Sequence, residues 1–149
     1  THEETLRIAK SVFNDNSIHF LNKCNPKYLA NFERYLPEYS DWLAANSMNS
    51  DHFCIDASAV LSSYGLRDCR DLDFLYLGDF INTGRDDFSC HNHETKYYPM
   101  HKDEVIVNPA NHFYHKGLKF ASPWVIKSMK QIRCEEKDLK DIQLLNSVL

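Results

Sequence analysis

The chain has 149 residues, of which 43% are hydrophobic and 13% aromatic, and this composition is typical of a globular domain rather than a disordered segment. A formal net charge of −4 argues against a dedicated nucleic-acid-binding protein, and no apolar run approaches the roughly 20 residues of a membrane span. Five cysteines without a C-x-x-C pair argue against a disulfide framework and indicate a reducing, cytoplasmic setting.

The first part of the chain, residues 1–50, is predicted to be helical. Apolar side chains recur at helical spacing over residues 3–13, and two glutamates suit the first turn of that helix. Two further helices are predicted over residues 26–36 and from Pro37 onward, because proline is well suited to the first turn of a helix. Residues 17–22 fit either a helix or a strand.

The middle part, residues 52–108, is predicted to form the sheet. Strands are expected at residues 52–55, 71–77, 88–98 and 102–107. Between the first two strands, Ser58 is expected to cap a short helix over residues 59–64, and Gly65 to end it. The strand at 71–77 is apolar on both faces after its start, which is typical of a central, buried strand.

The last part, residues 122–149, is predicted to form two helices. Ser122 precedes a proline at the start of the first, over residues 123–133, and the second covers residues 135–148. Helices, a cluster of strands and helices again indicate a single mixed α/β domain, with a small mixed sheet between N-terminal and C-terminal helices. Because Thr1 already lies in a helical pattern, we expect either a domain of a longer protein or a processed product.

Two carboxylates, Asp71 and Asp73, stand at the start of the predicted central strand. Residues two apart in a strand point to the same face, so the two side chains project side by side. Burying such a pair is unfavourable unless a cation or a hydrogen-bond donor neutralises it. Mg²⁺ takes oxygen ligands of this kind and keeps positions for water and substrate phosphates. The pair therefore predicts a magnesium site for phosphate chemistry, with Asp71 and Asp73 as metal ligands and catalytic residues.

A third carboxylate from a neighbouring strand usually completes such a site. Asp103 and Glu104, at the start of the predicted strand 102–107, are the candidates, and strand alternation places them on opposite faces. The sequence does not choose between them, and a solvated strand end is an equally good interpretation.

Four further residues are candidates for binding the phosphates of a substrate. Ser58 lies at the front of a helix, where free N–H groups favour an anion, although simple capping explains the serine as well. Arg67 lies close to the carboxylates and can hold a phosphate or pair with a neighbouring acid. Lys127 and Lys130 occur at helical spacing near the end of the chain, where lysines more often form a solvated face.

The histidines before the predicted strand 102–107 suggest a second kind of site. His91 and His93 lie two residues apart and fit zinc ligands together with Cys90 or His101, but no second ligand pair stands at a recognised spacing. His93 or Glu94 lining the pocket of an acceptor is the better interpretation.

These motifs resemble the signature of the nucleotidyltransferase-fold superfamily, the DNA polymerase beta-like group. The matching segments are Ser58, Gly65–Arg67 and Asp71–Leu75, which correspond to a Gly-Ser strand end, a short helix and a D-x-D that opens the next strand. The basic and acidic residues from Lys127 to Asp141 resemble the closing helices of minimal nucleotidyltransferases. The longer spacing from Ser58 to the first aspartate is similar to that of the phosphocholine-transferase and fukutin-like branch.

The resemblance implies a nucleotidyltransferase-type fold with Mg²⁺ on Asp71 and Asp73. It implies transfer of a nucleotidyl or other phosphate-linked group from an activated donor, such as a nucleoside triphosphate, to a hydroxyl of a small molecule or glycan, as in surface-polysaccharide synthesis. A third carboxylate would activate the hydroxyl, and Arg67 with Lys127 or Lys130 would hold the remaining phosphate charge. Nucleic acid is a weaker expectation for the acceptor because the chain is acidic.

Two other functions compete with this interpretation. Ala57 occupies the position where the superfamily has a glycine before the serine, and this favours a non-catalytic interaction domain of a larger protein. The third hypothesis is the toxin of a toxin–antitoxin pair, because some minimal members of the superfamily modify RNA or proteins.

Overall fold

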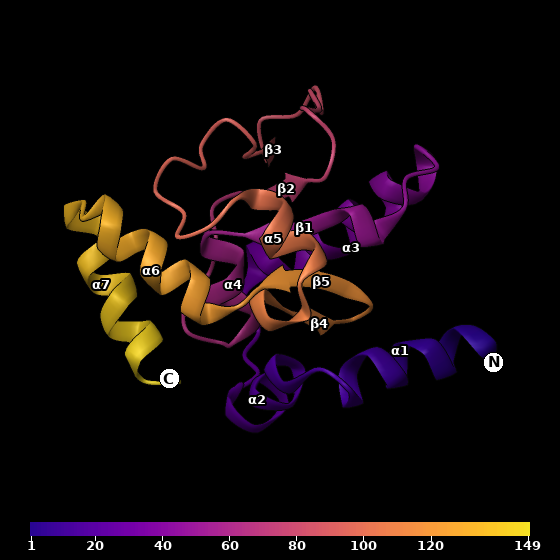
Figure 1. Cartoon of the computed structure of the whole chain (residues 1–149), viewed down its shortest axis with the longest axis horizontal. Coiled ribbons are helices and arrows are strands. Elements are labelled where there is room, and N and C mark those ends of the chain that lie inside the picture. The colour runs from indigo at the N-terminus through magenta and orange to yellow at the C-terminus, as the bar shows by residue number, and fades with distance from the viewer.

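A mixed five-stranded sheet lies at the centre of the computed structural model, which describes residues 1–149 (Figure 1). The strands are β1 (Phe53–Asp56), β2 (Leu72–Tyr76), β3 (Phe88–Cys90), β4 (His112–His115) and β5 (Leu118–Ala121). Their order across the sheet is β3-β2-β1-β5-β4. The pairs β1–β2 and β4–β5 are antiparallel, whereas β2–β3 and β1–β5 are parallel, so β1 is the central strand.

Seven α-helices surround this sheet, with three before the first strand and two after the last. They are α1 (His2–Val12), α2 (Asp15–Lys23), α3 (Ala30–Ala45), α4 (Ser58–Ser63), α5 (Lys102–Val107), α6 (Pro123–Arg133) and α7 (Glu136–Asn146). In Figure 1, α6 and α7 lie side by side at one end of the molecule, and α1 extends from the other end. None of the helices combines the length and the apolar character that crossing a bilayer requires.

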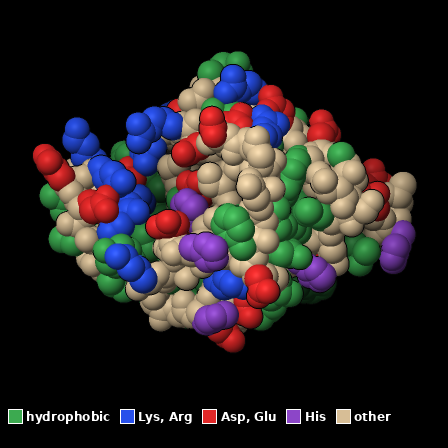
Figure 2. Space-filling model, turned by 90° about the horizontal axis from the view of Figure 1, so that it is seen from above, with side chains coloured by type: hydrophobic (Ala, Val, Ile, Leu, Met, Phe, Trp, Pro, Cys, Tyr) green, Lys and Arg blue, Asp and Glu red, His purple; other side chains and the backbone are tan.

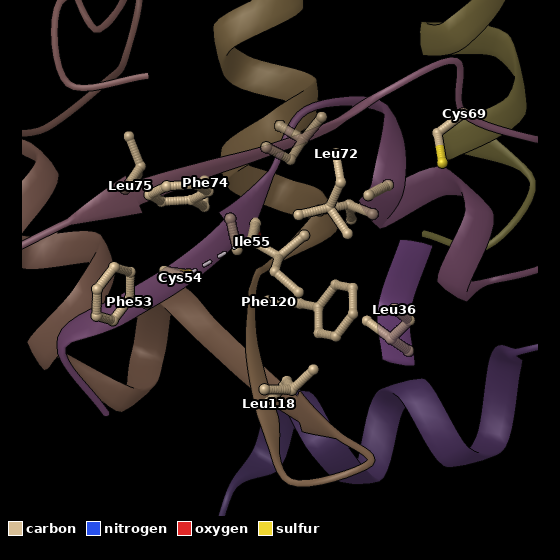
Figure 3. Packing of buried hydrophobic residues seen from close by; sticks show 14 of the residues in the cluster. Leu36, Phe53, Cys54, Ile55, Cys69, Leu72, Phe74, Leu75, Leu118 and Phe120 are labelled. Carbon is tan, nitrogen blue, oxygen red and sulfur yellow. Dashed lines mark hydrogen bonds between the residues drawn. The ribbon is translucent and has the colours of Figure 1, made fainter. Parts of the chain in front are cut away.

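The two faces of the sheet have different chemistry because strand side chains alternate. Helix α3 covers an aromatic face, on which Tyr39 packs against Phe74 and Phe88. On the same face Ile55 of β1 lies against its register partner Phe120 of β5 (Figure 3). The opposite face lies next to α5 and carries the carboxylates at the ends of β1 and β2. The apolar core therefore positions a polar edge.

Several predicted elements are confirmed. Helices occur as predicted near residues 3–13, 59–64, 123–133 and 135–148, and strands occur near 52–55 and 71–77. Helix α6 begins with Pro123 after Ser122, whose side chain accepts a hydrogen bond from the backbone N–H of Val125. The α/β class and the flanking of the sheet by N-terminal and C-terminal helices are as expected.

The expected helix boundary at Pro37 is wrong, because α3 runs through this proline without ending. A proline inside a helix costs about 3 kcal/mol. Five buried side chains on one face of α3 offset this cost, since each contributes about 1.5–3 kcal/mol; they are Phe32, Tyr35, Leu36, Tyr39 and Leu43. Residues 17–22, left open by the sequence, belong to α2, which Asn14 caps.

The expected strand over residues 102–107 is also wrong, because this segment is helix α5. The side chain of His101 accepts a hydrogen bond from the backbone N–H of Asp103 at the start of the helix, and acidic residues in the first turn suit the helix dipole. The neighbours Val105 and Ile106 are both buried, which fits a helix that packs one side against the sheet. The expected strand over 88–98 is reduced to β3, three residues long.

The hairpin of β4 and β5 was not predicted. Its two-residue turn consists of Lys116 and Gly117, with φ angles of 51° and 75°, which is the backbone that a tight hairpin needs. The hairpin brings β5 beside β1, so it completes the sheet on the side away from β2.

Candidate active site

A pocket of about 730 Å³ opens where the sheet edge, the segment before β2 and the last two helices meet. Only two of its 14 lining residues are hydrophobic. In Figure 2, Lys and Arg side chains gather at the end of the molecule formed by α6 and α7, with Asp and Glu side chains among them. The lining holds six Lys and Arg residues against four Asp and Glu residues, although the whole chain has a net charge of −4. The pocket is thus a local basic site on an acidic protein.

The pocket contains both aspartates of the D-x-D motif. Asp71 directly precedes β2, and Asp73 lies within it, almost buried at 8% exposure. Asp71 makes no hydrogen bond or ion pair, so its carboxylate is free for a ligand. The antiparallel register of β1 and β2 places Asp56, fully buried, directly opposite Asp73. Three carboxylates therefore cluster at this edge of the sheet.

Sequence reasoning missed Asp56 because the predicted strand stopped at residue 55, one position short of the observed end of β1. A signal was present, since the run Phe53–Asp56 places an acidic residue at the end of a fully apolar strand next to the proposed helix. The pairing of Asp56 with Asp73 could not be predicted from the sequence, because it depends on the register between β1 and β2.

His91 bridges two of the three carboxylates. Its Nδ1 lies 3.3 Å from Oδ2 of Asp56, and its Nε2 lies 3.1 Å from Oδ1 of Asp73. The hydroxyl of Tyr98 also donates to Oδ2 of Asp56. Oδ1 of Asp56 is buried and has no hydrogen-bond partner. The imidazole therefore neutralises Asp73 and Asp56 only in part.

Burial and charge act in opposite directions on these groups. Burial lowers the pKa of His91, but the charge of Asp56 and the hydrogen bonds to both aspartates outweigh it and raise the pKa to about 11. Burial raises the pKa of Asp73, and the charges of Asp56 and Asp71 add to the rise, while the contact with His91 opposes it. At neutral pH the site thus holds a protonated imidazole between Asp56 and Asp73, and burial disfavours the charged form of Asp73.

The donor set suits Mg²⁺ only in part. No three His, Cys, Asp or Glu side chains are arranged to hold a metal ion by themselves. Mg²⁺ commonly binds through one or two carboxylates plus substrate phosphates, and Asp71 and Oδ2 of Asp73 make no hydrogen bonds that would compete. The unpartnered buried oxygen of Asp56 adds uncompensated negative charge behind them. These residues therefore fit a Mg²⁺ ion that arrives with a phosphate ligand rather than one caged by protein side chains.

A buried ionic network forms the wall of the pocket opposite the sheet. Arg67 donates two hydrogen bonds to Asp141 of α7, at 2.6 and 2.7 Å, and Lys130 of α6 lies 2.8 Å from the same carboxylate. Asp138 pairs with Lys130 and with Arg133 at 3.4 and 2.6 Å. Hydrogen bonds from Arg67 and Lys130, against the effect of burial, lower the pKa of Asp141. The network fixes α6 and α7 against the segment before β2.

Three cations of the lining remain outside this network, and one of them, Lys137, pairs with Glu135 at 3.0 Å. Arg70 and Lys140 are both exposed and form no ion pair. On α7, Lys137 and Lys140 lie three residues apart on the face that carries Asp141 toward the pocket. Arg70 and Lys140 are therefore the side chains best placed to meet an incoming anion.

The residues expected from the sequence divide into two groups. Five of them line the pocket, namely Ser58, Arg67, Asp71, Asp73 and Lys130. Four do not line it, namely His93, Asp103, Glu104 and Lys127.

Each residue of the second group has a different setting. Asp103 pairs with Lys102 at 2.8 Å, and with Glu104 it lies in α5 rather than on the strand expected to carry a third carboxylate. His93 stacks on Phe80, with ring centroids 4.6 Å apart. Lys127 lies in α6, one turn before the buried Lys130.

The link between β1 and α4 is strained. Ala57 has φ 54° and ψ −133°, a conformation that favours glycine. It occupies the cap position of α4, and no side chain caps the helix there, so the expected capping by Ser58 is wrong. The strain lies directly beside the carboxylates of the pocket.

Comparison with protein-family models, curated proteins and solved structures gives no match to this chain. A functional assignment rests on the residues of the pocket.

Proposed function

We propose that this protein is a Mg²⁺-dependent transferase of the nucleotidyltransferase type, which moves a nucleotidyl or other phosphate-linked group to a hydroxyl of a small molecule or glycan. The observation that carries the proposal is the pair Asp71 and Asp73 in a basic pocket on an acidic chain. Carboxylates alone suit many cations, but carboxylates surrounded by Lys and Arg suit a cation bound together with phosphates.

Each residue has a role that follows from its contacts. Asp71 and the free oxygen of Asp73 hold the cation, which when bound neutralises charge on the donor phosphates and lowers the proton affinity of the acceptor hydroxyl. Arg70 and Lys140 bind the phosphate oxygens that the cation does not reach. Arg67 and Lys130 act through Asp141, since they hold α7 in position. Asp56, which accepts a hydrogen bond from Tyr98, orients His91, whose charge stands beside Asp73.

The test compares the wild type with an Asp71→Asn/Asp73→Asn double variant. We expect Mg²⁺ with a nucleoside triphosphate to raise the melting temperature of the wild type and to leave that of the variant unchanged. The variant should fold, because neighbouring carboxylates and burial already disfavour the charge of Asp73. Asp103→Asn is the matched control, since it removes one aspartate outside the pocket. Equal shifts in the wild type and the double variant would contradict the proposal.

A non-catalytic domain is the second candidate, and the position of His91 favours it. The imidazolium already places a positive charge between Asp56 and Asp73, where an enzyme of this type would use a metal ion. If this candidate is correct, neither Mg²⁺ nor any nucleotide changes the melting temperature, while His91→Ala lowers it strongly.

A further inference from the structure

The lining of the pocket offers charge but no surface for an aromatic ring. Its only hydrophobic residues are Ala57 and Leu144, and it contains no Phe, Tyr or Trp. Pockets that recognise a nucleobase usually provide apolar or aromatic side chains on which the ring stacks. The imidazole of His91 is the single ring present, and carboxylates hold both of its nitrogens.

The volume of the pocket does not explain this composition. At about 730 Å³ it lies within the range of sites that enclose whole nucleotides or drug-sized ligands. A base could enter, but Lys, Asp and Glu side chains gain little from contact with its ring face. Arginine can stack on a base, yet Arg67 and Arg133 are held by Asp141 and Asp138, and Arg70 is the side chain assigned to the phosphates. The same side chains suit a chain of phosphates and its counter-ion.

The free cations lie on separate elements around the carboxylates. Arg70 belongs to the segment before β2, whereas Lys140 belongs to α7, and neither has an acidic partner. Between them, the ion pairs of Arg67 and Lys130 with Asp141 keep the wall in place. Both free cations and both aspartates line the same pocket, which is the arrangement that an extended polyanion with its counter-ion requires.

Aromatic rings near the site are already used. Phe80 and His93 stack on each other with an angle of 7° between their planes, and neither lines the pocket. The hydroxyl of Tyr98 donates a hydrogen bond to Asp56. The pocket lining itself therefore offers no free aromatic ring on which a base could stack.

We propose that this pocket recognises its donor through the phosphate chain alone, so that the base or other group at the far end of the chain contributes nothing to affinity. This inference rests on the proposed function, in which the pocket binds a phosphate-linked donor. It defines the ligand class as compounds with two or more linked phosphates, whatever they carry, and inorganic tripolyphosphate is the simplest member.

Calorimetric titration in the presence of Mg²⁺ tests the inference with tripolyphosphate, the four common nucleoside triphosphates and adenosine. We expect the five phosphate compounds to bind with affinities within about threefold of each other, and adenosine not to bind. A base stacked on a ring would instead add roughly five- to 150-fold.

Variants then locate the contact. Arg70→Ala/Lys140→Ala should weaken all five compounds by the same factor, about tenfold for two exposed charge contacts. Lys27→Ala/Lys127→Ala is the matched control, since it removes two positive charges outside the pocket and should change no affinity.

The possible failures are distinguishable. One nucleotide that binds more than tenfold tighter than tripolyphosphate overturns the inference, and if its binding needs Mg²⁺ the proposed function stands. Equal binding of all five compounds that is independent of Mg²⁺ and of Asp71 and Asp73 overturns the proposed function and leaves recognition through phosphate intact. Absence of tripolyphosphate binding at millimolar concentration overturns the inference.

Discussion

Replacing Ala57 by glycine is expected to stabilise the protein. Ala57 joins β1 to α4 with a positive φ of 54° and a ψ of −133°, where the Cβ atom of any L-residue is crowded by its own backbone. It also holds the cap position of a helix, where glycine is preferred to alanine. Both effects favour glycine in the folded state.

The size of the effect follows from three contributions. A non-glycine residue in such a sparsely populated conformation costs about 1–3 kcal/mol. Glycine also lowers the free energy of unfolding by a few tenths to 1 kcal/mol, because it makes the unfolded chain more flexible. The methyl group of Ala57 is only half-buried, so its loss is minor. We expect the free energy of unfolding to rise by about 1 kcal/mol, which corresponds to roughly 2–4 °C in melting temperature for a chain of this size.

Urea unfolding of the two proteins measures the difference directly. Gly84→Ala is the matched reverse substitution, since Gly84 has φ 69° and nothing within 4 Å of an added Cβ, so only the backbone conformation is tested. It should lower stability by about 1 kcal/mol. An Ala57→Gly variant that unfolds at or below the urea midpoint of the wild type, with an unchanged slope, would refute the strain at Ala57.

Three further predictions concern other buried groups. Asp141→Ala should lower the free energy of unfolding by about 3 kcal/mol, because it leaves Arg67 without an acidic partner and Lys130 with only its longer contact to Asp138, whereas Glu136→Gln on the exposed side of α7 should change it by less than about 0.5 kcal/mol; similar losses for both would contradict the network. Burial lowers the pKa of His112 to about 4, so the folded protein resists its protonation, and stability should fall as the pH drops from about 6.5 to 4. His112→Asn keeps a donor for the Val105 carbonyl and should remove about 2–3 kcal/mol of this pH dependence in urea titrations; an unchanged dependence would show that His112 is not buried neutral. Asn92→Ala should lower the free energy of unfolding by about 2–3 kcal/mol in the same assay. The side-chain amide of Asn92 forms hydrogen bonds with the N–H and C=O of Tyr76 in β2 and with the carbonyls of Gly78 and Asp79 in the following turn. A loss below about 0.5 kcal/mol would exclude that role.

The sequence reveals what is local and misses what depends on pairing between distant segments. The D-x-D pair is visible because Asp71 and Asp73 immediately precede a run that is buried on both faces. The neighbour of Asp73 across the strands, Asp56, depends on register, and so does the position of His91 between them. Likewise, the ion pair of Arg67 joins residues 74 positions apart, and no spacing rule predicts it.

Short apolar segments are the other source of error. In α5, the run Val105–Val107 has the β-branched composition of a strand, yet the segment is a helix, with a capping side chain at His101 and acidic residues in its first turn. The hairpin turn at Lys116–Gly117 carried a usable signal, a glycine between two aromatic runs. Its consequence, a strand inserted beside β1, lies in the topology and not in the turn itself.

The dependence of the pocket on α7 has a consequence during synthesis. Arg67 precedes its partner Asp141 by 74 residues, a stretch that a ribosome takes roughly 4–15 s to translate. For that time the carboxylates of β1 and β2 have Arg67 and Arg70 beside them but lack the four basic residues of α6 and α7 that line the pocket. If the proposed function holds, competence to bind a phosphate donor begins late, when α7 emerges and docks, and a chain interrupted before that helix carries the aspartates without Lys137 and Lys140.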